Sequence, residues 1–327
     1  MKFEFTVYPG FSFRDEFAEK FDLEITRNRV IIPDRLGQGY IKEINTNNNL
    51  KLVIHHYRLK EEFYQRRLGS SEQSSMVSVV FNSHEIPTGE VNDKENLVQS
   101  LNKNESTIQV ASSLLGTETV FPANKDIRFM VVGVRRPALK SLLQAKNLNN
   151  QVQTILNSKS TFFYHEQMSA DIQRIFDKLF LNTDRDKLVN LFYRYKTEEL
   201  IYHLFSQLLH RENAKQLAIN KDDIMKLNNV HAAIIKDTSE PPKIDELTKK
   251  AGMSKTKMKQ LFKQIYGDSI YNYYLNARME DAAYLLKHAN LPVSEVGFRV
   301  GYTNLSHFSR MFRKHYGKNP KKYSSDG

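Results

Sequence analysis

Hydrophobic and polar residues alternate in short runs over about the first 140 residues of the chain. Four segments rich in β-branched and aromatic residues are predicted as strands: residues 50–59, 74–83, 107–115 and 127–136. Polar stretches at 45–49 and 87–96 are typical of turns. Because no amphipathic helical pattern separates these strands, we expect an all-β sandwich or barrel.

Beyond Ala138 the apolar residues recur every three or four positions, which is the spacing of amphipathic helices. One helix is predicted from His165 to Phe180, with the apolar stripe Met168, Ile172, Ile175, Phe176 and Leu179. A longer helix is predicted from Arg185 to Arg211, with the stripe Leu188, Leu191, Phe192, Tyr195, Leu200, Ile201, Leu204, Phe205, Leu208 and Leu209. This second stripe could form a dimer seam or pack as core against the strands, and we favour a role in both.

These patterns divide the chain into two domains, as its length of 327 residues allows. A β-rich domain is expected over residues 1–212, with strands to about residue 136 and helices from about residue 138. The polar segment 213–223 is expected to be a linker. Residues 224–327 are expected to form an all-α domain punctuated by Gly and Pro.

The all-α domain contains an internal repeat. One copy, residues 252–267, has the sequence GMSKTKMKQLFKQIYG, and the other, residues 301–317, has the sequence GYTNLSHFSRMFRKHYG. Both begin with Gly and an apolar residue, and both end with Phe, three further residues and Tyr-Gly. Each follows a short helix-like stretch, at 244–251 and at 293–300.

The spacing of this repeat predicts two helix-turn-helix units. In each unit the first helix ends at a Gly that adopts the left-handed turn conformation. Ser254 and Thr303 are predicted to cap the second helices. The apolar faces of these helices consist of Met258, Leu261 and Phe262, and of Phe308, Met311 and Phe312. The opposite faces are polar and free to enter a major groove, whereas the alternative is a helical hairpin with a solvated outer face.

The distribution of charge favours the nucleic-acid interpretation. From Lys221 to the end the chain has 19 Lys and Arg against 11 Asp and Glu, a net charge of +8. The first 220 residues have 29 against 26, a net charge of +3, so about a third of the chain accounts for most of the total of +11. Such a basic domain indicates a polyanionic partner, usually nucleic acid.

Several other classes of protein are disfavoured. The chain has no Cys, which excludes disulfides, thiol catalysis and cysteine-ligated zinc, and a cytoplasmic location is the default expectation. No apolar run approaches about 18 residues, so we expect no membrane partner. His55 and His56 are neighbours in a predicted strand and should point to opposite faces, so they are not expected to bind one metal ion. His84 is distant from both in sequence. No nucleophile-elbow, phosphate-loop or dinucleotide motif is present, and we expect no catalytic site, no metal and no cofactor.

Residues from about 224 to 323 resemble the AraC/XylS family of bacterial transcription regulators. The resemblance depends on IDELTKKAGMSKTKMKQLFKQIYGDSIYNYYLNARMEDAAYLLK and PVSEVGFRVGYTNLSHFSRMFRKHYGKNPKKY, and covers about a third of the chain. It implies two helix-turn-helix units joined by a long central helix, here about Ser269 to Leu286. This sequence departs from the family pattern at Gly297, where Ala is usual, and at Lys243 and Pro292, which occupy usual N-cap positions.

The resemblance also implies which side chains meet DNA. The base-facing positions are Thr256, Lys259 and Gln260 in the first unit, and Leu305, Ser306, His307, Ser309 and Arg310 in the second. Arg310 or Lys259 would suit guanine, Gln260 adenine and Leu305 a thymine methyl group. The expected phosphate contacts are Lys255, Lys257, Arg313 and Lys314. Arg278 of the central helix is interpreted as a structural brace between the two units.

In this family a cupin-type β-barrel often precedes the DNA-binding part and senses a small molecule, and the adjoining helices often mediate dimerisation. Residues 121–143 also resemble the end of sensor domains in siderophore-type members. We therefore expect an α+β two-domain protein with a cupin-like N-terminal β-barrel, dimerisation helices and a C-terminal all-α domain. The expected partners are double-stranded DNA, a small-molecule effector, a second copy of the chain and RNA polymerase.

Three alternatives or open points remain at the level of sequence. The N-terminal domain could lack an effector and only dimerise or bind a protein, or the chain could be an enzyme with a regulatory tail, for which no catalytic constellation is found. Apolar strand residues that could line a pocket, or equally be ordinary core, are Val53, Tyr57, Val79, Phe81 and Met130.

Overall fold

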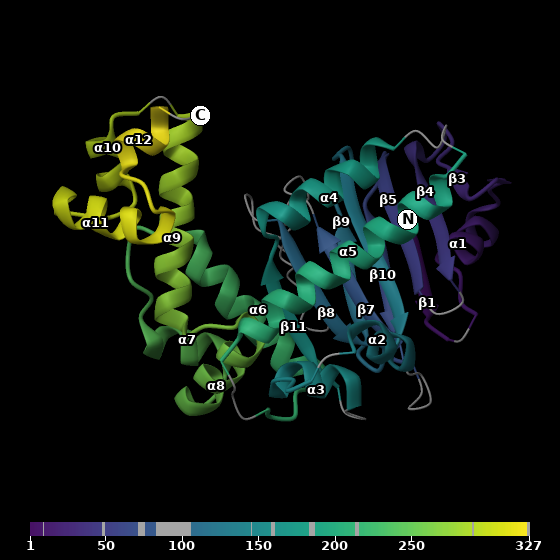
Figure 1. Ribbon diagram of the computed structural model, residues 1–327, viewed down its shortest axis with the longest axis horizontal. Helices are drawn as coiled ribbons and strands as arrows, with labels where there is room; N and C mark the ends of the chain where they lie inside the picture. The colour runs from purple at the N-terminus through teal and green to yellow at the C-terminus, as the bar shows by residue number, and fades with distance from the viewer. Residues whose placement is uncertain are drawn as a thin grey trace. The chain divides into compact units, whose positions relative to one another are not determined.

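The computed structural model describes residues 1–8, 10–47, 50–70, 76–82, 106–144, 146–157, 161–182, 187–212, 216–289 and 291–325. The chain forms two compact units, residues 1–225 and 226–327, which are considered separately below. In Figure 1 the first unit contains the strands, and the second is the helical unit in green and yellow.

The first unit contains two β-sheets. The larger has the strand order β11 (Phe163–Gln167), β8 (Thr107–Ser112), β7 (Met76–Asn82), β10 (Ile127–Arg135), β5 (Leu50–Leu59), β4 (Gly37–Asn47), β3 (Arg29–Ile31) and β2 (Ile25–Thr26). The smaller consists of β1 (Lys2–Thr6), β6 (Phe63–Leu68) and β9 (Thr117–Phe121), with β1 parallel to β6. The β-rich prediction and the four predicted strands are confirmed, as β5, β7, β8 and β10. Among the described strands the larger sheet is open, with β11 and β2 at its edges.

Helices cover the larger sheet on one side. They are α2 (Arg136–Leu143), α3 (Asn150–Asn157), α4 (Ala170–Leu181) and α5 (Val189–His210), and Figure 1 shows α4 and α5 lying across the strands. The core beneath them includes Val79, Phe81 and Met130. The opposite face of the sheet packs against the smaller sheet and α1 (Phe13–Phe21), in a second core that includes Phe63 and Phe129.

Two elements of this unit differ from the prediction. The region expected to contain strands alone includes α1, which is capped by the Ser12 side chain accepting from the Asp15 N–H. The helix predicted from His165 begins later, because residues 163–167 pair with β8 as β11. Ser169 then caps α4, its side chain accepting from the Ile172 N–H. The turn predicted at 45–49 is partly strand, since β4 extends to Asn47, and the turn predicted at 87–96 lies outside the described residues.

The apolar stripe predicted over 185–211 divides between two faces of α5. One face is buried in the core and consists of Leu200, Ile201, Leu204, Phe205 and Leu208. The other is exposed and consists of Leu188, which directly precedes α5, and of Leu191, Tyr195 and Leu209, together with Tyr202, which the prediction does not include. Phe192 is half-buried and packs against the core. The buried Lys42 of β4 donates to the Tyr193 hydroxyl at 2.6 Å and fastens α5 to the sheet. Residues 185–186 of the predicted helix lie outside the described residues.

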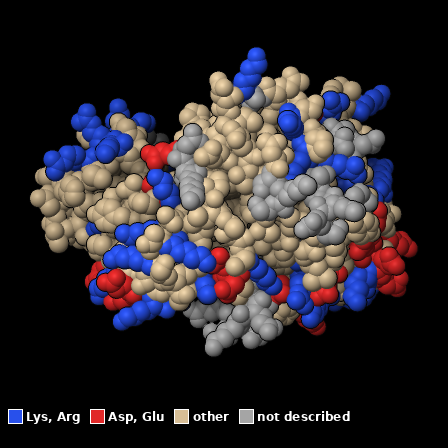
Figure 2. All heavy atoms as spheres, turned by 90° about the horizontal axis from the view of Figure 1, so that it is seen from below, with Lys and Arg blue, Asp and Glu red and all other residues tan. Residues whose placement is uncertain are grey.

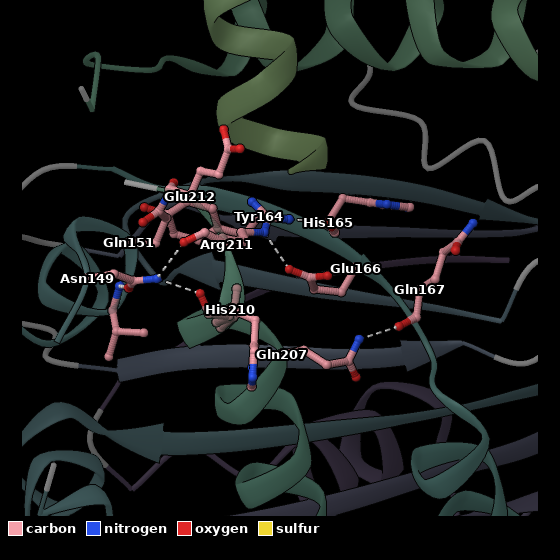
Figure 3. A network of polar contacts seen from close by, with 12 residues as sticks. Asn149, Gln151, Tyr164, His165, Glu166, Gln167, Gln207, His210, Arg211 and Glu212 are labelled. Atoms are coloured by element: carbon pink, nitrogen blue, oxygen red, sulfur yellow. Dashed lines mark hydrogen bonds and ion pairs between the residues drawn. The ribbon is translucent and has the colours of Figure 1, made fainter. Parts of the chain in front are cut away.

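The chain that leaves α5 is held on the first unit by polar contacts with β11 and α3 (Figure 3). Arg211 forms an ion pair with Glu166 of β11 at 2.6 Å. Burial raises the pKa of the Glu166 carboxyl, and the attraction of Arg211 opposes that shift. Farther along, the Tyr164 hydroxyl donates to the Gln216 side chain at 2.9 Å. The described part of the predicted linker is therefore fastened to the sheet rather than free.

The second unit is all-α. Its helices are α6 (Lys221–Lys236, which begins within the first unit), α7 (Ile244–Ala251), α8 (Lys255–Tyr266), α9 (Ile270–His288), α10 (Val293–Arg299), α11 (Leu305–Tyr316) and α12 (Pro320–Ser325). The start of α6 corrects the predicted linker of 213–223, because the Asn220 side chain accepts from the Asp223 N–H at 2.7 Å and caps the helix earlier. No helix among the described residues is long and apolar enough to cross a membrane.

Candidate nucleic-acid interface and an internal cavity

The first repeat forms a helix-turn-helix from α7 and α8. Gly252 ends α7 in the left-handed conformation, with φ of 57° and ψ of 39°. Ser254 caps α8 as predicted, its side chain accepting from the Lys257 N–H at 3.3 Å. Met258, Leu261 and Phe262 are completely buried, so the apolar face of α8 is turned inward.

The second repeat forms the same arrangement from α10 and α11. Gly301 follows α10 with φ of 79°. The predicted cap Thr303 is wrong: Asn304 caps α11, its side chain accepting from the His307 N–H at 3.0 Å. Asn is among the strongest N-cap residues and directly precedes the helix. Phe308 and Phe312 are completely buried, and the predicted face member Met311 is half-buried.

The first helices of both units begin without a side-chain cap, as the sequence predicted. Neither Lys243 before α7 nor Pro292 before α10 makes a capping hydrogen bond. Close packing explains why residue 297 of α10 is Gly, where the family usually has Ala. A Cβ atom at this position would lie 2.8 Å from a methyl group of Leu305 and 3.1 Å from the Phe308 ring, so Gly lets α11 approach α10 closely.

The central helix α9 packs against both helix-turn-helix units. Tyr273 in its first half contacts Phe262 of α8, with ring centroids 5.6 Å apart. Its second half, from Met279 to Leu286, shares a core with Phe308 and Phe312 of α11. Figure 1 shows α9 running between the helix-turn-helix of α7 and α8 and that of α10 and α11.

Arg278 of α9 has a structural role, as predicted, but its contacts lie within α9 and the second helix-turn-helix unit rather than between the two units. Its Nε donates to the Val300 carbonyl and its Nη1 to the Tyr274 hydroxyl at 2.9 Å. The guanidinium also lies 3.9 Å from the centroid of the Tyr302 ring. These contacts connect the middle of α9 to the turn of the second helix-turn-helix unit.

The outer faces of α8 and α11 contain the predicted DNA-contacting residues. Those that are exposed are Thr256, Lys259, Gln260, Ser306, His307 and Arg310, and those that are half-buried are Leu305 and Ser309. Leu305 packs back on Gly297, which leaves less of its side chain to meet a base. The turn and helix geometry thus presents a polar surface in both units.

The predicted phosphate-contacting residues Lys255, Lys257, Arg313 and Lys314 are all exposed. Figure 2 shows Lys and Arg side chains gathered over the helical unit, at the left of the view. Lys255 also forms a long ion pair of 3.6 Å with Asp245 of α7, and both side chains are exposed. Such a pair contributes little to stability, so Lys255 remains available to an anion.

The comparisons with known proteins concern this part of the chain. A family model described as a helix-turn-helix domain matches residues 247–326. The Msm operon regulatory protein of Streptococcus mutans is 27% identical over 100 residues, which cover 31% of this chain and 36% of that protein. The regulatory protein SoxS of Escherichia coli is 27% identical over 97 residues, which cover 30% of this chain and 91% of that protein. The C-terminal part of the chain belongs to the AraC/XylS family.

Solved structures match a similar share of the chain. A probable AraC family transcriptional regulator from Rhodopseudomonas palustris is 25% identical, with a TM-score of 0.29, and the match covers 31% of this chain and 95% of that one. The chain spans little more than a third of the length of the Msm operon regulatory protein. Family membership therefore describes the double helix-turn-helix domain.

Outside the AraC/XylS domain, the first unit contains a partly open cavity of about 210 Å³. Its walls come from the inner faces of both sheets and from the segment that precedes α1. Of the five pocket residues suggested by the sequence, Val53 alone lines the cavity. Val79, Phe81 and Met130 face the helices instead, and Tyr57 belongs to the aromatic core beside the cavity. The alternation of side chains along a strand assigns them to two faces of the sheet, but it does not indicate which face lines a cavity.

His55 and His56 lie on opposite faces of β5, as predicted. His55 is buried and stacks on Phe129, with ring centroids 4.0 Å apart. Burial lowers the pKa of His55 to about 3. His56 points to the helical side, where it contacts the edge of Phe180 and lies 3.4 Å from Asp126. His55 therefore lines the cavity as a neutral side chain at physiological pH.

Proposed function

We propose that this protein is a sequence-specific transcription regulator that binds double-stranded DNA through α8 and α11. The observation that carries the proposal is the pair of helix-turn-helix units on one central helix, each with an exposed polar face on its second helix. An α-helix of this kind fits the major groove of B-DNA. A basic unit adds attraction to the phosphates on both sides of the groove.

Within this proposal, two groups of side chains have different tasks. Thr256, Lys259 and Gln260 of α8, and Leu305, Ser306, His307, Ser309 and Arg310 of α11, would contact bases. Lys255, Lys257, Arg313 and Lys314 would contact phosphates, which position the domain without specifying sequence. Both groups lie on the second helices of the units, which is where a helix-turn-helix contacts DNA.

The function is tested by measuring the affinity of the full chain for a site selected from random duplexes and for a shuffled version of that site. We expect the selected site to bind more tightly, and both affinities to fall as salt rises, because phosphate contacts release counterions. A chain that binds both duplexes equally, with an affinity that salt leaves unchanged, would not be a sequence-specific regulator.

We also propose that the N-terminal unit is a cupin-like sensor whose cavity takes a small-molecule effector. The cavity favours this reading over a unit that only dimerises, because polar side chains in its wall lack hydrogen-bond partners among the described residues. Buried polar groups normally have partners, and a ligand would supply them. If effector and DNA bias the same equilibrium, each must change the affinity of the other by the same factor.

We further propose that two copies of the chain pair through α5. Its exposed apolar residues recur every seven positions at Leu188, Tyr195, Tyr202 and Leu209, with exposed fractions of 64%, 57%, 66% and 38%. A seven-residue apolar repeat is the spacing of helices that pack along each other. Leu191, which is 59% exposed, adds the intermediate position of the heptad.

The dimer is tested by Tyr195→Glu, which introduces a charge into the middle of this seam. We expect the wild-type chain to sediment as a dimer and Tyr195→Glu to be a monomer with an unchanged circular-dichroism spectrum, since Tyr195 is exposed on its own unit. Ile31→Glu is the matched control, because Ile31 is an apolar residue outside α5 and is 52% exposed. A monomeric wild type, or a Tyr195→Glu variant as dimeric as the control, contradicts the seam.

A further inference from the structure

The wall of the cavity contains hydrogen-bond donors without acceptors. Arg67 of β6 and Asn82 of β7 are 8% and 2% exposed, and both line the cavity. Arg67 donates from Nη2 to the Leu115 carbonyl at 2.9 Å, but its Nε has no hydrogen-bond partner among the described residues. The same holds for the Nδ2 group of Asn82. The Nδ1 atom of His55, which donates or accepts according to the tautomer, also has no partner among the described residues. Leaving buried donors unpaired costs free energy that an acceptor would recover.

The strand register places two of these groups in one row, on either side of Phe129. His55 of β5 pairs with Phe129 of β10, and Phe129 pairs with Asn82 of β7, so the three side chains form one row on the cavity face of the larger sheet. Two residues along, Val53, Val131 and Val80 form the next row. Arg67 faces these rows from the smaller sheet. The wall of the cavity thus combines polar groups from both sheets with a row of valines.

The charges around the cavity do not balance. Among the described residues, its lining includes the cations Lys51, Arg67 and Arg135 and the acid Glu43. Lys51 is paired with Glu43 at 3.3 Å, which leaves Arg135 and Arg67. Arg135 is half-buried, whereas Arg67 is a buried guanidinium with no carboxylate partner among the described residues. Burial lowers the pKa of Arg67 to about 10, so the side chain stays protonated at neutral pH. A buried charge without a counter-charge is costly, and an anion bound beside it removes that cost.

The remaining lining and the volume limit the rest of the ligand. Phe5, Phe11, Phe121 and Phe129 give the cavity an apolar, aromatic interior. A dry apolar cavity of about 150 Å³ holds benzene, so 210 Å³ suits a body about the size of one ring and a short side chain. A polyhydroxylated ligand would leave hydroxyl groups against these rings without partners.

We propose that the cavity binds a small organic monocarboxylate with an apolar body, whose carboxylate is held by Arg67 and whose body lies on the valine row. This inference deepens the proposed effector site and rests on it. Asn82 would donate a further hydrogen bond to the ligand. Charge-assisted hydrogen bonds to a guanidinium are among the strongest available to a buried carboxylate.

The test compares phenylacetate with phenylacetamide, which has the same size and no charge, by following the melting temperature and the heat of binding of the full chain. We expect phenylacetate, and hexanoate as an aliphatic probe, to raise the melting temperature in a saturable way. Phenylacetamide should bind at least about tenfold more weakly, since it is neutral and forms no ion pair with Arg67. Absence of a response to both carboxylates, or an equal response to the amide, overturns the proposal.

Arg67→Met removes the charge and keeps the length of the side chain. Because it replaces an uncompensated buried charge by an apolar group, we expect the ligand-free variant to melt no lower than the wild type and to lose the phenylacetate response. Arg66→Met is the matched control, since Arg66 is 45% exposed and pairs outside the cavity with Glu4 and Glu118. A retained response in Arg67→Met contradicts the assignment. The comparison of acid with amide needs no variant and decides the proposal even if Arg67→Met does not fold.

The same samples separate this inference from the proposed function. The affinity for a selected DNA site is measured with and without saturating phenylacetate. Specific DNA binding without any carboxylate binding overturns the ligand class and leaves the regulator intact. Carboxylate binding that leaves DNA affinity unchanged supports the ligand class and contradicts the role as effector.

Discussion

Gly301→Ala is expected to destabilise the C-terminal unit by about 2–5 kcal/mol and to abolish DNA binding near physiological temperature. Two effects add. Gly301 has φ of 79°, a conformation that costs an L-residue about 1–2 kcal/mol. A Cβ atom there would lie 1.9 Å from the Ser239 carbonyl oxygen and 2.7 Å from Nη2 of Arg278, an overlap of the kind that costs about 1–3 kcal/mol when neighbours must shift.

The neighbours of Gly301 have little freedom to move. Thr238, next to Ser239, donates to the Asp281 carboxylate of α9 at 2.5 Å. Arg278 holds the turn of the second helix-turn-helix unit to α9, so displacing it weakens the attachment of that unit to the central helix.

Gly252→Ala is the matched control. Gly252 occupies the corresponding turn of the first unit with φ of 57°, but a Cβ atom there would meet nothing within 4 Å. Only the conformational cost of about 1–2 kcal/mol is expected. Thermal unfolding of both variants, with DNA affinity measured on the same samples, gives the comparison. Equal losses in the two variants would show that the close approach at Gly301 has no energetic weight.

The sequence predicted the C-terminal unit more fully than the N-terminal one. Gly252 and Gly301 mark the turns because the left-handed conformation favours Gly, and such signals act locally. The cap of α11 was misplaced by one residue, since Thr303 and Asn304 are adjacent polar residues that can both cap and only the helix start distinguishes them.

The errors in the N-terminal unit have non-local causes. Residues 163–167 form β11 because they pair with β8, more than fifty residues earlier, although the apolar spacing that follows suggests a helix. The cavity was not predictable from local patterns, because its walls come from two sheets that pack together only in the folded unit. Arg67 gives no signal in the sequence, because its burial depends on β6 pairing with β1 and β9 opposite the larger sheet.

Arg310→Ala and Gln260→Ala are expected to change base preference at different places in the DNA site. Gln260 lies on α8 and Arg310 on α11, and both side chains are exposed. If both helices enter the major groove on one face of DNA, their contacts lie about one helical turn, roughly 34 Å, apart. Arg310→Ala should relax preference within one segment at a cost of about 1–3 kcal/mol if its contact with a base is bidentate. Gln260→Ala should act on the other segment.

Lys314→Ala serves as the control for these two variants. Lys314 is exposed on α11, one turn beyond Arg310, and is proposed to contact a phosphate. Its loss should weaken binding to all sequences similarly and lower the salt dependence, because a phosphate contact contains no direct information about the base.

A binding-site selection from random duplexes, performed with the full wild-type chain and with these three variants, tests whether α8 and α11 read DNA. We expect one asymmetric pattern per domain with two segments about a helical turn apart. Arg310→Ala should relax one segment, Gln260→Ala the other and Lys314→Ala neither. Selected sites in which Arg310→Ala and Gln260→Ala alter the same base pairs, or in which neither alters any, would contradict the placement of α8 and α11 in the DNA.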